Sequence, residues 1–156
     1  MNLYKDKYII VDIIPTHSDS NKGFIAQLSA LKLDGIKLLD RFDYRVKDEL
    51  IGIPDIMNLM TYDKDQFTYV DNIYFIIEKF KRWAEDYPIL LMEENYTPGY
   101  LSELDNKKEL IYPYLDMEYS LDIIERIMDK YKIEKTPHLV DILYEAIIFH
   151  GDKKED

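Results

Sequence analysis

The sequence predicts a single α/β domain with a mixed sheet, in which a three-strand antiparallel meander is extended by parallel strands and flanked by helices. The first observation is a nearly continuous apolar run at residues 8–14, typical of a strand covered on both faces. The second is the pair Asp34-Gly35, typical of a two-residue hairpin turn. The third is a change to helical periodicity after Thr68 and then a short apolar run, which together predict a right-handed parallel crossover.

The antiparallel meander is predicted from the first third of the chain. The strand at residues 8–14 ends at Pro15, and turn-forming residues follow at 17–23. Residues 24–33 alternate around small side chains, and the Asp34-Gly35 turn leads into a third strand at 36–46.

The remaining elements are predicted mainly from helical stripes and capping residues. Apolar positions spaced for one helix face predict a helix over 68–84, opened by Thr68 with Asp71 as its capping partner. We expect a loop or short helix at 51–60, a buried strand at 88–92 and a short helix at 96–104. Ser120 is predicted to cap a helix through Tyr131, and Thr136-Pro137 to open a last helix that Gly151 closes. Residues 1–150 would then form one domain, with 151–156 as a charged flexible tail.

Composition limits the function. The chain has 156 residues, 47% of them hydrophobic, which suffices for one core. Its 20 Lys and Arg against 31 Asp and Glu give a net charge of −11, which disfavours nonspecific binding to nucleic acid. With no cysteine, thiolate metal sites and cysteine nucleophiles are excluded. No apolar run reaches the length of a signal peptide or a membrane span, so we expect no membrane partner and a cytoplasmic location.

Three segments carry a resemblance to a known superfamily. They read VDIIPT at 11–16, LLMEENYTPGYL at 90–101 and TPHLVDILYEA at 136–146. In this order they resemble the three motifs of the ribonuclease H-like 3′ to 5′ exonucleases of the DEDDh type, which include RNase T and the proofreading subunit of DNA polymerase III. The resemblance extends over nearly the whole chain and implies an exonuclease-type fold.

The resemblance also implies a chemistry that can be checked by position. Members of the superfamily use two divalent ions held by about four carboxylates, with a histidine that accepts the proton of the attacking water. Asp12 and Asp141 match two of these carboxylates. Ile14 stands where the second ligand of the first motif belongs, Thr97 at the aspartate of the second motif, and Thr136 at the closing histidine. We therefore expect a degenerate metal site.

Three further residues are candidate substitutes for the missing groups. His138 lies three residues before Asp141 and could replace the histidine, although a surface or first-turn histidine is the favoured interpretation. Glu93 and Glu94 could replace a lost carboxylate, although a solvated pair at a strand end is the more common case. Asp12 and Asp141 could themselves serve structure alone, by accepting turn N–H groups or by lying at a helix N-terminus. If they lie together, one weak Mg²⁺ or Mn²⁺ site is expected.

Two functions follow from these expectations. The first is a noncatalytic exonuclease-fold protein that acts by binding another protein through its acidic, tyrosine-rich surface. The alternative is a metal-dependent 3′ to 5′ exonuclease on single-stranded DNA or RNA, with His138, Glu93 or Glu94 as substituted groups. The first is favoured because three of the five expected chemical positions differ.

Overall fold

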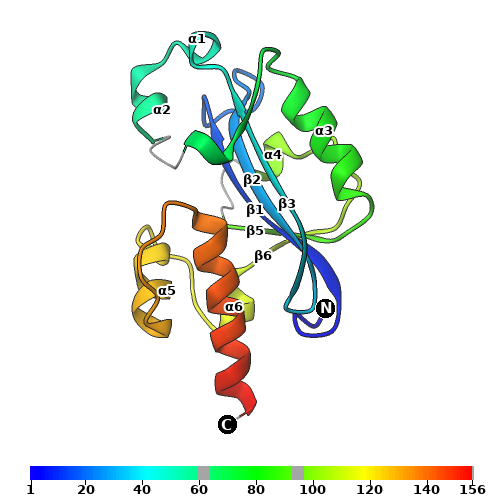
Figure 1. Cartoon of the computed structure of the whole chain (residues 1–156), viewed down its shortest axis with the longest axis vertical. Coiled ribbons are helices and arrows are strands. Elements are labelled where there is room, and N and C mark those ends of the chain that lie inside the picture. Colours follow the sequence, from blue (N-terminus) through cyan, green and yellow to red (C-terminus); the bar gives the residue numbers. More distant parts are fainter. Residues whose placement is uncertain (60–63, 93–96, 156) are drawn as a thin grey trace.

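The structure is a computed structural model that describes residues 1–59, 64–92 and 97–155. These residues form a six-stranded mixed sheet in the order β4-β3-β2-β1-β5-β6, with helices on both of its faces (Figure 1). The predicted fold class is confirmed.

The strands and helices have the following bounds. The strands are β1 Lys7–Pro15, β2 Ile25–Asp34, β3 Lys37–Val46, β4 Thr68–Val70, β5 Ile89–Leu91 and β6 Lys108–Leu110. The α-helices are α1 Asp48–Ile51, α2 Pro54–Leu59, α3 Phe75–Ala84, α4 Thr97–Tyr100, α5 Ile123–Tyr131 and α6 Leu139–Glu155. Two short 3₁₀ helices are η1 Lys64–Gln66 and η2 Tyr112–Leu115.

Strand β1 is the centre of the sheet. It pairs antiparallel with β2 on one side and parallel with β5 on the other, and β2 pairs antiparallel with β3. The register places Asp12 opposite Ser29 and Ser29 opposite Asp43. Directly opposed residues point to the same face of a sheet, so these three side chains form one row across three strands.

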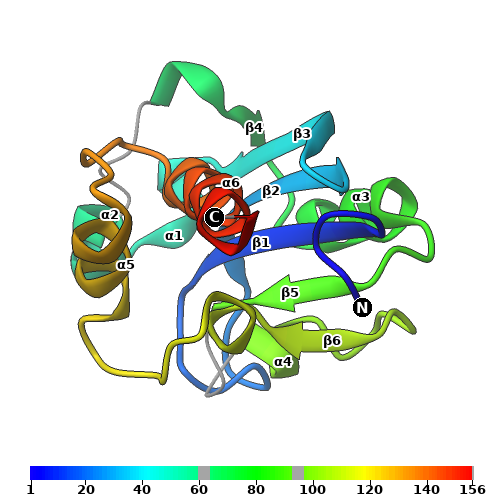
Figure 2. The same cartoon turned by 90° about the horizontal axis from the view of Figure 1, so that it is seen from below.

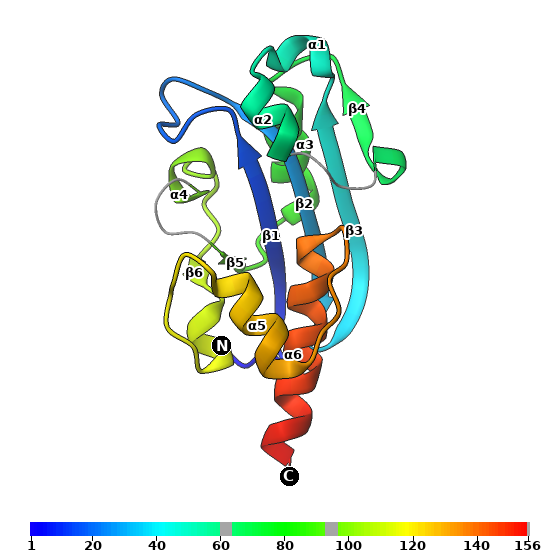
Figure 3. The ribbon, with the colours of Figure 1, turned by 90° about the vertical axis from the view of Figure 1, so that its left-hand side faces the viewer.

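Each face of the sheet has its own apolar layer. On one face α3 packs Ile76 and Phe80 onto residues such as Val11 and Leu28. On the other face α5 and α6 lie over the half of the sheet that contains the start of β1 (Figures 2 and 3). Burying one such side chain stabilises the fold by roughly 1.5–3 kcal/mol. Because β1 is covered on both sides, its position, and that of Asp12, is fixed by packing.

The predicted helix over 68–84 is wrong in its first part. Thr68–Val70 forms β4, which pairs parallel with the end of β3, where Val70 lies opposite Val46. Helix α3 starts only at Phe75, and its N-cap position Tyr74 has no side-chain capping bond. The predicted cap at Thr68 and Asp71 is therefore wrong. The apolar periodicity that includes Val70 predicts a helix there, but pairing with the open end of β3 makes the segment a strand.

Two other boundaries differ from the prediction, and one strand was not predicted. The hairpin turn is Gly35-Ile36 rather than Asp34-Gly35, since Asp34 pairs with Lys37 and Gly35 has the positive φ of 58°. Helix α5 starts at Ile123. The Ser120 hydroxyl donates to the Asp122 carboxylate and does not cap the helix. Strand β6, a short edge strand of half-buried residues, was not predicted.

The last helix is displaced at both ends. It starts at Leu139 rather than at Thr136-Pro137, and it continues through Gly151 to Glu155, so Gly151 does not close it. The predicted flexibility of residues 151–156 stays a prediction. Gly151 has another role: a Cβ built there would lie 2.5 Å from Cε1 of Tyr4. The glycine thus lets the N-terminal segment pack against α6, whereas in the sequence it resembled a helix end.

Candidate functional site

The face of the sheet under α6 changes from apolar to polar side chains along its strands. In the row of Ile10, Leu31 and Arg41, the residues of β1 and β2 are apolar and belong to the core shared with α5 and α6, while β3 contributes Arg41. The next row, Asp12, Ser29 and Asp43, is polar. The start of α6 lies above this boundary and brings Asp141, in its first turn, close to β3.

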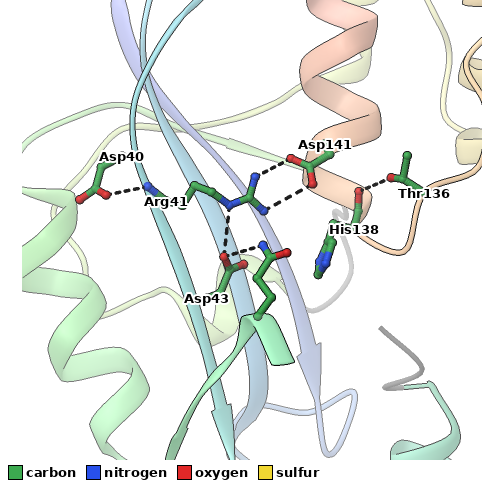
Figure 4. Close-up of polar contacts among 7 residues, drawn as sticks. Asp40, Arg41, Asp43, Thr136, His138 and Asp141 are labelled. Carbon is green, nitrogen blue, oxygen red and sulfur yellow. Dashed lines mark hydrogen bonds and ion pairs between the residues drawn. The ribbon is translucent and has the colours of Figure 1, made fainter. Parts of the chain in front are cut away.

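Arg41 of β3 connects the sheet to α6 (Figure 4). Its Nη1 donates to Oδ1 of Asp141 at 2.6 Å and its Nη2 to Oδ2 at 3.4 Å. Its Nε donates to Oδ2 of Asp43 at 3.3 Å, and the same oxygen accepts a 2.8 Å bond from Nε2 of Gln66. One guanidinium thus bridges two carboxylates that come from different elements.

The bridge lies partly out of solvent. The Arg41 and Asp141 side chains are 31% and 32% exposed, whereas Asp43 is 8% exposed. Burial disfavours the charged guanidinium, but the hydrogen bonds and charges of Asp141 and Asp43 outweigh this effect, and the pKa of Arg41 is raised above its ordinary value. The guanidinium is therefore cationic at every accessible pH.

A second arginine occupies the following row of the same face. Arg45 lies opposite Gln27 and is fully buried. Its Nη2 donates to Oδ1 of Asp48 at 2.7 Å, and its guanidinium lies 5.7 Å from the centre of the Tyr69 ring. The positive charge that accompanies the aspartates on this face is thus supplied by the protein itself, from Arg41 and Arg45 of β3, which lie two residues before and after Asp43.

His138 is buried at the start of α6, where its carbonyl accepts from the N–H of Asp141, so of the two expected placements, surface or first turn, the surface one is wrong. It is 7% exposed, and its ring lies 6.0 Å from that of Phe67, centre to centre. The segment between η1 and β4 covers it, an arrangement that the local sequence does not reveal. The hydroxyl of Thr136 donates to the His138 carbonyl at 3.1 Å, so it does not cap α6.

The other predicted site residues are distributed around this face. Asp12 is half-buried in the central strand, and Ile14 belongs to the buried apolar core. Thr97 is buried at the start of α4. Glu93 and Glu94 lie outside the described residues, so their role as substitutes stays a prediction.

Arg41, Asp43 and Gln66 were not predicted as site residues. A signal was present in the sequence, because Arg41, Asp43 and Arg45 alternate along a predicted strand and must share one face. The alternation does not reveal which helix faces these residues. The contact of Arg41 with Asp141 joins residues 100 positions apart, which only the tertiary structure brings together.

The residues described here do not fit a pair of divalent ions as they stand. Hard cations need oxygen ligands that converge on one point, but both oxygens of Asp141 and one of Asp43 accept N–H groups of Arg41. Within residues 1–59, 64–92 and 97–155 no group of three His, Cys, Asp or Glu side chains is arranged to hold a metal. The weak Mg²⁺ or Mn²⁺ site that the sequence suggested for Asp12 and Asp141 is not tested by these contacts, and the hydrogen bonds from Arg41 to both oxygens of Asp141 count against it.

A second candidate site is a groove between α5 and the start of α6. Its volume is about 540 Å³. Leu121 at its edge is 96% exposed, a rare environment for a leucine. The apolar lining residues are Leu121, Ile123, Ile124, Met128, Leu139 and Ile142, and the charged ones are Asp122, Glu125 and Lys135.

Comparison by sequence gives no assignment. No family model matches the chain, and no curated protein matches it. Among the described residues, no helix is both long and apolar enough to cross a membrane.

Comparison by structure finds exonuclease I. A product-bound structure of exonuclease I matches with a TM-score of 0.62 and 12% identity over 93% of this chain and 42% of the other. A zinc-bound complex of E. coli exonuclease I with single-stranded DNA gives 0.60 and 10% over 97% and 41%. A complex with SSB-Ct gives 0.61 and 12% over 93% and 40%. The chain thus spans about two fifths of these proteins, and at such identity the likeness establishes an exonuclease-like fold alone.

Proposed function

We propose that this chain is an exonuclease-fold protein whose metal site is degenerate and which acts by binding another protein. The observation that carries the proposal is the bridge from Arg41 to Asp43 and Asp141. A guanidinium fixed at these carboxylates supplies the positive charge that the chemistry of the fold would take from metal ions. It has no vacant coordination position for a water or a phosphate oxygen, so it cannot generate the hydroxide nucleophile.

Residues elsewhere on the same face support the proposal. Ile14 cannot ligate a cation and lies in the apolar core. His138 is 7% exposed and packs against Phe67, so its access to a substrate water is restricted.

The groove between α5 and α6 supports a role in protein binding. An open apolar stripe on a helix is the usual docking surface for an amphipathic segment of a partner. Asp122 and Glu125 lie along the groove with one lysine, Lys135, so acidic charge exceeds basic charge there, and the whole chain carries a charge of −11. The partner segment is therefore expected to have an apolar face bordered by lysine or arginine.

A nuclease assay tests the noncatalytic part of the proposal. Labelled single-stranded DNA and RNA are incubated with the protein in Mn²⁺ and, separately, in Mg²⁺. We expect no shortening above a buffer control, while an active exonuclease in the same buffers degrades both substrates. Metal-dependent shortening that is lost in Asp12→Ala would overturn the proposal.

Such activity would instead support the competing function. That function is a metal-dependent 3′ to 5′ exonuclease on single strands, in which Glu93, Glu94 or His138 supplies a missing group. It is supported by the structural neighbours, one of which is exonuclease I in complex with single-stranded DNA.

A peptide-binding experiment tests the protein-binding part. The probe is a synthetic amphipathic helix with lysines on its polar face, and its matched control carries glutamates instead. Fluorescence anisotropy should show binding of the lysine peptide that Leu121→Asp and Met128→Asp each abolish, with little binding of the control. Equal binding of both peptides, or binding that neither substitution changes, would contradict the proposed surface.

A further inference from the structure

Arg41 is held between two carboxylates in the way that a bound cation would be. The guanidinium has three N–H contacts to the oxygens of Asp43 and Asp141, at 2.6, 3.3 and 3.4 Å. The two carboxylates come from β3 and α6, so their side chains approach each other across the guanidinium. Without that positive charge, the two would face each other in a partly desolvated space and repel.

A second observation indicates that this space favours a cation. The Asp43 side chain is 8% exposed, and its Oδ1 is buried without a hydrogen-bond partner among the residues that the structure describes. A buried carboxylate oxygen that lacks a donor carries a desolvation cost. It is therefore available as a ligand for any cation that enters beside Arg41 or replaces it.

We propose that Arg41 is a built-in cation that excludes divalent ions from the Asp43–Asp141 pair, and that its removal converts the pair into a binding site for Mn²⁺ or Mg²⁺. Carboxylate oxygens are the ligands these hard ions prefer. The two carboxylates supply two negative charges, water completes the coordination shell, and the space vacated by the guanidinium accommodates the ion. This inference deepens the proposed function, because it identifies what stands in place of the metal.

The test compares Mn²⁺ binding by the wild type and by Arg41 variants. Binding is followed by the loss of the free Mn²⁺ signal in electron paramagnetic resonance and by the melting temperature, with ionic strength matched by NaCl. We expect the wild type to show neither effect. Arg41→Ala should bind Mn²⁺, and at an ion concentration roughly tenfold above its dissociation constant it should melt about 3–6 °C higher.

Three further variants test the assignment of the site. Arg41→Ala combined with Asp141→Asn removes one of the two carboxylates and should lose most of the Mn²⁺ effect. Arg126→Ala is the control, because Arg126 pairs with Asp122 on the exposed side of α5 and its removal should create no Mn²⁺ response. Arg41→Gln preserves more of the side-chain packing and should bind Mn²⁺ as Arg41→Ala does.

Several results would overturn the inference. They are Mn²⁺ binding by the wild type as tight as by Arg41→Ala, no binding by folded Arg41 variants, or equal binding after Asp141→Asn is added. Failure of both Arg41 variants to fold even in Mn²⁺ would also overturn it, because the ion should then replace the lost charge. These results concern only Mn²⁺ binding at the Asp43–Asp141 pair. Failure of the proposed function would instead appear as nuclease activity of the wild type.

Discussion

At the scale of single residues, the chemistry of this face of the sheet depends on whether the carboxylate contacts of Arg41 offset the cost of removing its guanidinium from water. Removing a guanidinium from water is costly, and a buried ion pair does not always offset that cost. Here Arg41 keeps 31% of its side-chain surface in solvent and contacts two carboxylates, one of them through both oxygens. Bidentate geometry is the arrangement in which charge-assisted hydrogen bonds are strongest. The pair with Asp141 should therefore contribute measurably to stability.

Asp141→Asn tests this contribution. The substitution removes a charge but preserves shape, and it leaves Arg41 with Asp43 as its charged partner. We expect a loss of about 1–2 kcal/mol, between the values of exposed and buried pairs, and a melting temperature lower by about 3–6 °C. Thermal unfolding followed by circular dichroism measures it.

The matched control is Asp122→Asn at the exposed Asp122–Arg126 pair, where the closest contact is 3.8 Å. It should leave the melting temperature unchanged, since asparagine suits the N-cap position as well as aspartate does. Equal effects of the two substitutions would mean that the pair with Arg41 is no stronger than an exposed one.

The sequence predicts these residues only in part. Asp12 and Asp141 can be located because each belongs to a segment with a recognisable pattern. Arg41 cannot be assigned a partner, because a strand pattern determines the face of a side chain but not the helix that covers it. The burial of His138 is unpredictable for the same reason: Phe67, which it contacts, comes from a segment 71 positions earlier.

At the scale of elements, α6 is the link between the site and the core. Its first turn carries Asp141, its middle packs on β1 and β2, and its last turns contact the N-terminal segment. Tyr4 contributes to the last contact, since its hydroxyl donates to the carbonyl of Ile147 at 3.3 Å. The far end of α6 thus helps to position its first turn.

Gly151→Ala tests the close packing of Tyr4 on α6. Alanine normally stabilises a helix over glycine by about 1 kcal/mol. At this position its Cβ would lie 2.5 Å from the Tyr4 ring, and overpacking of this kind costs about 1–3 kcal/mol. We expect a net loss of about 1 kcal/mol by urea denaturation. In a Tyr4→Ala background the same change should stabilise, and stabilisation in the wild-type background would contradict the packing described.

The contact between α5 and α6 predicts a loss of stability in alkali. Burial, followed by the charges of Asp116 and Tyr4, raises the pKa of Tyr131 to about 12 from 10.0. The folded state therefore retains a proton that the unfolded state releases. The stabilisation of the folded state by protonated Tyr131 is complete below pH 10 and is lost as the pH rises from 10 to about 12.

Tyr131→Phe isolates this contribution. It should cost about 1 kcal/mol near neutral pH, because the Tyr131 hydroxyl contacts Nδ1 of His150 at 2.7 Å and the Leu115 carbonyl at 3.2 Å. Urea denaturation at a series of pH values should show a shallower decline above pH 10 in the variant. An unchanged alkaline slope would contradict the assignment.

Element boundaries illustrate where local sequence patterns fail. Apolar periodicity correctly located α3 and α5, but it extended the first helix into Thr68–Val70, which β3 pairs as a strand. Capping residues were misleading at Ser120 and Thr136, because both hydroxyls bond to other groups. Strand pairing and side-chain partners at a distance outweighed local propensity in each case.

At the scale of the whole molecule, the fold was predictable although its details were not. The buried β1, the hairpin and the crossover determine which strands are neighbours, and the strand order confirms that arrangement. Exonuclease I shares the architecture at 10–12% identity. A fold preserved at such identity depends on the pattern of buried positions, whereas catalysis depends on a few particular side chains.

The most direct test of the central claim is a crystal structure of the wild-type protein soaked in Mn²⁺, with anomalous scattering measured to locate the ion. We predict no manganese peak beside Asp12, Asp43 and Asp141, and an Arg41 guanidinium that still bridges Asp43 and Asp141. One or two manganese ions bound by these aspartates, with Arg41 displaced into solvent, would contradict the account.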